Sequence, residues 1–187
     1  MTTEPIIESG MTFGPYLDGH FFRIEKTATL DKINKGAKPD EGVKIAEFLL
    51  LRMEGQTPTI WVIEAKNGSP QPAKQADFDK FIHEVKDKLS NSLLLFLAIY
   101  LKRHSTELEL PPCFQKIDLS TTHFKFVLII TSNTYKEEWL PPLQDALLEV
   151  LNPIVKRMVK MWNLSSSDVI VMNQDIAKKN GLHKDLD

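Results

Sequence analysis

Two oppositely charged residues follow the apolar part of the segment TIWVIEAKNGSP, which covers residues 59–70. Its first half is apolar enough to be a buried strand, yet Glu64 and Lys66 stand two residues apart at its end. Because side chains alternate along a strand, both should point to the same face. Charged groups on a buried strand are costly unless other groups compensate them. The pair is therefore a candidate for a chemical site.

A second carboxylate is predicted beside this pair. Residues 44–52 and 58–66, KIAEFLLLR and PTIWVIEAK, are the clearest predicted strands of the chain. If a two-residue loop at Gly55–Gln56 joins them into a hairpin, Glu47 faces Glu64. A slip by one residue would put the two glutamates on opposite faces, whereas a shift by two would keep them neighbours.

Two carboxylates and a lysine at one spot suit metal chemistry. Facing residues of an antiparallel pair lie about 4.5–5.5 Å apart, where like charges destabilise the sheet. A divalent ion such as Mg²⁺ compensates such carboxylates and keeps waters as its other ligands. A lysine beside the ion can hold the attacking water and offset charge on a phosphate. We therefore expect a Mg²⁺ or Mn²⁺ site at Glu47 and Glu64, with Lys66 beside it.

Glu47, then Glu64-Ala65-Lys66, then a long helix together resemble the metal site of the PD-(D/E)XK nuclease superfamily, which has the restriction-endonuclease-like fold. The likeness covers residues 20–103 by motif and element order, and EFLLL…WVIEAKNGSP is similar to uncharacterised bacterial members. It implies that Glu47, Glu64 and the backbone carbonyl of Ala65 bind the metal and that Lys66 serves the attacking water. The implied activity is that of a Mg²⁺-dependent endonuclease that hydrolyses DNA.

The first acid departs from the superfamily's pattern. It is usually an aspartate, often preceded by proline, whereas Glu47 follows an alanine. Pro39-Asp40 matches the letters better, but Asp40 would face a position beyond the hairpin, so Glu47 is the preferred ligand and Asp40 the alternative. Glu25, at the end of a short candidate strand, resembles the extra upstream ligand that some members supply.

Residues around the motif have weaker predicted roles. Ser69 and Lys80 lie near the site in the sequence and could contact a phosphate. His83 and Glu84 are expected on a solvated helix face rather than as a ligand pair. Trp61 should lie in the core, on the face of its strand opposite Glu64.

The other elements predict an α/β fold class, with a mixed central β-sheet flanked by helices and a restriction-endonuclease-like core. Apolar periodicity predicts a helix over 74–103, whose apolar second half other elements must cover. Prolines divide 137–162 into two helices, with a start near Pro141 and a boundary at Asn152–Pro153, and the tail after 173 is expected to fray. Further strands are predicted at 21–26, 124–131 and 168–173.

We expect a single domain over 1–187, with the motif-bearing core at about 20–131 and the C-terminal helices and last strand at 137–173. The 187 residues are 42% hydrophobic and 26% charged, enough for a substantial core. The longest apolar run, Leu93–Leu101, is far short of the roughly 20 residues that cross a bilayer, so no membrane partner is expected. No signal peptide is visible at the N-terminus, which predicts a cytoplasmic location.

Charge and cysteine content leave the partner open. The net charge of −2 gives no overall attraction to nucleic acid, although lysines cluster over 26–38 and basic residues over 156–160. The single cysteine, Cys113, excludes an intramolecular disulfide framework. The resemblance implies DNA as substrate and a homodimer. The alternatives are a catalytically silent nucleic-acid-binding or assembly subunit of a larger complex, and an RNA-cutting enzyme with the same site.

Overall fold

The computed structural model describes residues 1–38, 41–104, 109–131, 138, 140–147, 149 and 164–182. The strands are β1 (Ile6–Glu8), β2 (Met11–Phe13), β3 (Phe21–Phe22), β4 (Phe48–Glu54), β5 (Thr57–Lys66), β6 (His123–Ile130) and β7 (Val169–Asn173). The helices are α1 (Ala28–Asn34), α2 (Gln75–Tyr100), α3 (Pro112–Gln115) and α5 (Gln174–Lys179), with 3₁₀ turns η1 (Ile24–Lys26) and η3 (Ser166–Asp168). Residues 140–147 are also helical.

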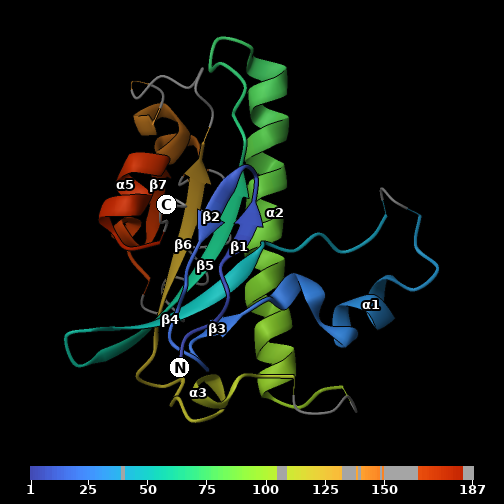
Figure 1. Cartoon of the computed structure of the whole chain (residues 1–187). Helices are drawn as coiled ribbons and strands as arrows, with labels where there is room; N and C mark the ends of the chain where they lie inside the picture. The colour runs from blue at the N-terminus through green and yellow to red at the C-terminus, as the bar shows by residue number, and fades with distance from the viewer. Residues whose placement is uncertain are drawn as a thin grey trace.

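A five-stranded mixed sheet in the order β3-β4-β5-β6-β7 forms the centre of the fold (Figure 1). The pairs β3-β4 and β4-β5 are antiparallel, whereas β5-β6 and β6-β7 are parallel. Strands β1 and β2 form a separate two-stranded sheet. The predicted α/β class with a mixed central sheet is therefore confirmed.

Strands β4 and β5 form the predicted hairpin in the predicted register. Phe48 faces Ile63, and the turn carries Gly55 at a φ of +65°, a conformation that glycine adopts without strain. Strand β4 begins at Phe48 and not at residue 44. One residue before it, the same register puts Glu47 opposite Glu64.

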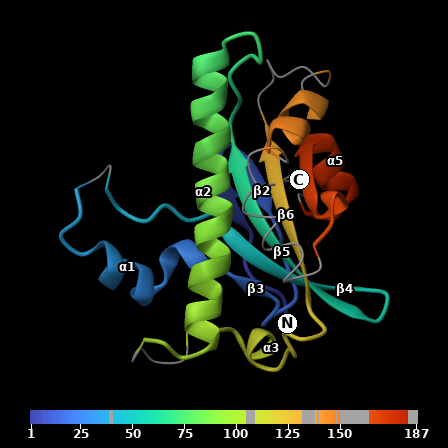
Figure 2. The same ribbon diagram turned by 180° about the vertical axis from the view of Figure 1, so that it is seen from behind.

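The alternation along β5 divides the core between the two faces of the sheet. Ile60 and Val62 pack in the cluster that contains the buried side of α2. Trp61 and Ile63 pack on the other face, with residues of β2 and α5. Figures 1 and 2, seen from opposite sides, show α2 on one face and the β1–β2 hairpin on the other. The prediction that Trp61 lies in the core, away from Glu64, is confirmed.

Helix α2 confirms the long predicted helix, but other elements cover less of it than expected. Its predicted apolar stripe, which begins at Phe78 and ends at Leu89, is buried. In the second half, however, Leu94 is 59% exposed. It lines a groove of about 240 Å³ between α1 and α2, together with Ile33 and Val43. In the part of the chain that the structure describes, no helix combines the length and apolarity needed to span a membrane.

The strand predicted over 21–26 is shorter than expected. It pairs only at Phe21 and Phe22, and the chain then turns into η1, where Ile24 is fully buried on the α2 side of the sheet. The predicted strands over 124–131 and 168–173 correspond to β6 and β7.

The prediction that the tail after residue 173 frays is wrong for residues 174–182. Asn173 caps helix α5 by accepting a hydrogen bond from the Ile176 N–H at 2.9 Å. Ala177 and Leu182 are fully buried against the sheet, so the tail is held by apolar packing. The predicted helix start near Pro141 agrees with the helical residues 140–147, whereas the predicted boundary at Asn152–Pro153 lies outside the described residues.

Candidate metal centre

Glutamates and basic side chains form two groups of ion pairs where β4 begins and β5 ends, and the neighbouring carboxylates of Glu8, Glu25 and Glu47 link the two groups into one string. Glu8, Glu25, Glu47, Glu64 and Glu84 supply the carboxylates, and Arg23, Lys66 and Lys88 supply the cations between them. Five carboxylates and three cations leave an excess of two negative charges. This count omits Lys26, which contacts Glu25 but is mostly exposed. A divalent cation would balance this excess.

Glu64 lies at the centre of the string and is fully buried. Its Oε1 accepts a hydrogen bond from Lys88 Nζ at 2.8 Å and lies 3.4 Å from Lys66 Nζ. Its Oε2 is also buried and has no hydrogen-bond partner among the described residues. Burial raises the pKa of Glu64, and the two lysines only partly oppose this shift. An unpaired carboxylate oxygen in such a place is an available metal ligand.

Helix α2 fixes the segment that carries Glu47. The backbone N–H of Ala46 donates to Ser92 Oγ at 2.8 Å, and the same hydroxyl donates to the carbonyl of Lys88 at 2.8 Å. Ser92 is fully buried, so this link is protected from water. Strand β4 starts only after Glu47 because the N–H of Ala46 bonds to helix α2 rather than to a neighbouring strand.

The Glu47 carboxylate lies in a strongly negative environment. Its side chain is only 13% exposed, and Lys88 Nζ is 3.8 Å from its Oε1. Burial raises the pKa of Glu47 to about 7, helped by the charge of Glu64 and opposed by Lys88. Glu47 and Glu64 therefore form the pair predicted from the hairpin register, and their lysine partner comes from α2.

Removing the Ser92 hydroxyl should loosen this arrangement. Ser92→Ala leaves the buried N–H of Ala46 without an acceptor, which typically costs about 1–3 kcal/mol of unfolding free energy. We expect urea unfolding to show that loss and Glu47 to be held less firmly. Ser90→Ala, two residues earlier on the same helix, is the control. Equal unfolding free energies for the two variants would contradict the role of Ser92.

The N-terminal hairpin adds residues that the sequence analysis did not include. Ser9 and Gly10 form its turn with φ values of 50° and 77°, and a Ser-Gly pair between IIE and MTF is the signal that could have predicted it. Ser9 Oγ donates to the Ala65 carbonyl at 2.9 Å, and Thr131 Oγ1 donates to the Ser9 carbonyl at 2.9 Å. These bonds attach the turn to the ends of β5 and β6.

Glu8, on the same hairpin, joins Glu25 and Glu47. One carboxylate oxygen from each of the three lies within 4.8 Å of the others, and all three side chains are partly buried. Arg23 Nη2 bonds Glu8 at 2.5 Å and Glu25 at 2.8 Å, so it holds these two acids together. The structure thus brings Glu25, the predicted additional ligand, to Glu47, and adds Glu8.

Lys66 lies on the Glu64 side of the string. Its Nζ is 3.4 Å from Glu64 Oε1 and donates to Glu84 Oε1 at 3.3 Å. Burial acts to raise the pKa of Glu84, but the charge and hydrogen bond of Lys66, together with the charges of Lys44 and Lys88, lower it below its ordinary value. His83 is exposed, as expected, whereas Glu84 is half-buried and holds Lys66.

Among the residues that the structure describes, no hydrogen bond or ion pair joins the remaining predicted residues to the string. Ser69 is half-buried, with a hydroxyl that has no hydrogen-bond partner in those parts of the chain, and Lys80 is exposed on α2. Asp40, the alternative first ligand, lies outside the described residues, as do the basic residues of 156–160.

The donor set suits a hard divalent cation, which prefers carboxylate and carbonyl oxygens. Glu47 and Glu64 offer two carboxylates, and the unpaired Oε2 of Glu64 is an observation in favour of the fit. The Ala65 carbonyl accepts one hydrogen bond from Ser9 and keeps a second lone pair.

Comparison with protein-family models, with curated proteins and with solved structures found no match. A functional proposal therefore depends on the geometry of this site.

Proposed function

We propose that this chain is a Mg²⁺-dependent nuclease with a restriction-endonuclease-like core, which hydrolyses phosphodiester bonds of DNA through a metal-activated water. The observation that supports it most is the position of Glu47, one residue before β4, opposite Glu64 in the extended hairpin register, with Lys66 two residues further on in β5. Two further observations support it: Oε2 of Glu64 has no hydrogen-bond partner among the described residues, and burial and the charge of Glu64 raise the pKa of Glu47 despite the nearby Lys88.

Each residue has a role in this proposal. Glu47, Glu64 and the Ala65 carbonyl hold the ion, with Glu25 as a further candidate ligand. Bound Mg²⁺ supplies a water of lowered pKa and polarises the phosphate. The Lys66 ammonium, held between Glu64 and Glu84, positions the attacking water and offsets the negative charge that develops on the phosphate.

The test is cleavage of plasmid, linear duplex DNA, single-stranded DNA and RNA with Mg²⁺, Mn²⁺ or EDTA. We expect cutting of DNA with either metal and none with EDTA. Lys66→Met should lower the rate by roughly 100-fold, the usual effect of removing one group that stabilises the transition state. Lys86→Met is the matched control, because Lys86 pairs with Asp87 on α2. Cleavage that survives EDTA, or that Lys66→Met leaves intact, would contradict the proposal. Cleavage of RNA alone would show that the substrate is RNA and not DNA.

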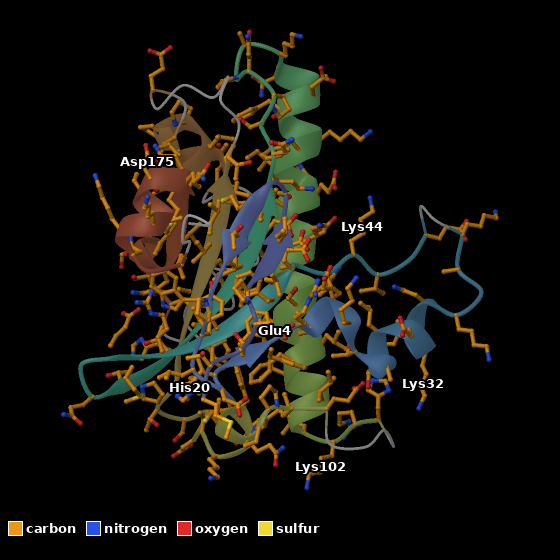
Figure 3. The ribbon with its side chains drawn as sticks, in the orientation of Figure 1. Glu4, His20, Lys32, Lys44, Lys102 and Asp175 are labelled. Carbon is orange, nitrogen blue, oxygen red and sulfur yellow. The ribbon has the colours of Figure 1, made fainter. Side chains whose placement is uncertain are left out.

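A second candidate is the binding or assembly subunit without catalysis. The groove between α1 and α2 supports it, because its lining includes the exposed apolar side chains of Ile33, Val43 and Leu94. Lys32 and Lys44, both exposed, lie on the side of the molecule that carries α1 (Figure 3). Absence of metal binding, together with retention of the fold, would favour this candidate over the nuclease.

A further inference from the structure

The ammonium of Lys88 lies between the two carboxylates assigned to the metal. Its Nζ is 2.8 Å from Glu64 Oε1 and 3.8 Å from Glu47 Oε1. All three side chains are largely or fully buried, so solvent screens these contacts little. A cation bridging Glu47 and Glu64 would compete with this ammonium for the negative charge of the same two carboxylates.

The backbone of Lys88 is fixed, whereas its side chain has a second partner within reach. Ser92 holds the Lys88 carbonyl, but the four-carbon stem of a lysine can move its charge without moving the backbone. Glu84 lies four residues earlier on α2, the spacing at which helical side chains are neighbours, and it already contributes to the charge environment of Lys88. Glu84 is half-buried and already binds Lys66 through Oε1, and a carboxylate has acceptor sites for a second ammonium.

We propose that Lys88 is the internal counter-ion of the metal-free site, and that its ammonium moves from Glu47 and Glu64 towards Glu84 when a divalent cation binds. This inference rests on the proposed function, because it takes Glu47 and Glu64 as the metal ligands. Lys88 then stabilises the metal-free protein and weakens metal binding. It sets the metal concentration at which the site fills.

Calorimetric titration with Mn²⁺ alone, without nucleic acid, tests this inference. Lys88→Met should bind Mn²⁺ at least tenfold more tightly than wild type, and its metal-free form should melt at a lower temperature. Lys86→Met, which removes an ammonium from the same helix, should match wild type in both measurements. Unchanged or weaker Mn²⁺ binding by folded Lys88→Met would overturn the inference.

Glu84→Gln gives a second measurement that does not depend on the folding of Lys88→Met. Removing the acceptor for the displaced ammonium should weaken Mn²⁺ binding several-fold in the wild-type background, and unchanged binding would overturn the displacement step. Glu47→Gln separates the two proposals. If it abolishes Mn²⁺ binding while Lys88→Met leaves affinity unchanged, only the role of Lys88 is wrong. If folded wild type and Lys88→Met both fail to bind Mn²⁺, the metal site and the nuclease proposal are wrong as well.

Discussion

Replacing Glu64 by glutamine should abolish metal-dependent cleavage while the protein still folds. The substitution keeps the shape of the side chain and an oxygen for Lys88, but it removes the charge and the unpaired carboxylate oxygen. Loss of a residue that only hydrogen-bonds to a metal ligand typically lowers activity by up to roughly 100-fold. Loss of the ligand Glu64 itself should lower the cleavage rate by more than this. The buried amide N–H lacks an acceptor, so the unfolding free energy should fall by about 1–3 kcal/mol.

The decisive measurement is the stabilisation of the protein by Mg²⁺ without substrate. A ligand that binds only the folded state at 100 times its dissociation constant adds about 2.7 kcal/mol of stability. Wild type should gain this amount and Glu64→Gln should gain none. Glu54→Gln is the matched control, because Glu54 lies on the same hairpin and also pairs with a lysine, Lys125, but is the last residue of β4, at the opposite end of the hairpin from Glu64. Equal stabilisation of all three proteins by Mg²⁺ would show that Glu64 is not a ligand.

The pairing of Glu47 with Glu64 could be predicted because it depends on local chemistry. A glycine that fits a tight turn fixes the register of the β4–β5 hairpin, and the alternation of side chains fixes which residues share a face. The same alternation put Trp61 correctly in the opposite half of the core. No information from distant parts of the chain was needed.

The partners of this pair could not be predicted, since they come from elements far away in the sequence. Lys88 is next to Leu89 on the buried side of α2, and only the way the helix crosses the sheet decides that its ammonium reaches Glu64. Glu8 belongs to a hairpin whose turn is visible in the sequence but whose attachment through Ser9 to Ala65 is not. Leu94 shows the same limit, because an apolar run does not reveal which of its residues other elements cover.

The stability of the metal-free protein should fall as the pH rises through 7. The folded pKa of Glu47 is about 7 and its ordinary value is 4.5, so between these values the folded state keeps a proton that the unfolded state has lost. The resulting stabilisation is fully present below about pH 4.5 and is lost as the pH rises through the folded pKa. A difference of this size corresponds to on the order of 3 kcal/mol, and the raised pKa of Glu64 acts in the same direction.

The same proton should compete with the metal. Below about pH 7, Glu47 is neutral in most molecules and binds a cation poorly, so metal affinity should rise by about tenfold per pH unit and level off above pH 7. The two effects have one origin: the charge that destabilises the metal-free protein at high pH is the charge that the metal binds. Saturating Mg²⁺ should therefore flatten the fall in stability.

Urea unfolding at pH 5.5, 6.5, 7.5 and 8.5, with and without Mg²⁺, measures both effects. Glu47→Gln is the control, because its amide cannot titrate while every other titratable residue of the chain is kept. We expect the metal-free variant to lose much less stability than wild type between pH 5.5 and 8.5, and to gain nothing from Mg²⁺. Parallel curves for the two proteins would mean that Glu47 titrates near its ordinary pKa in the folded state. The excess negative charge around Glu47 would then be compensated inside the protein, and a divalent cation would gain little by binding there.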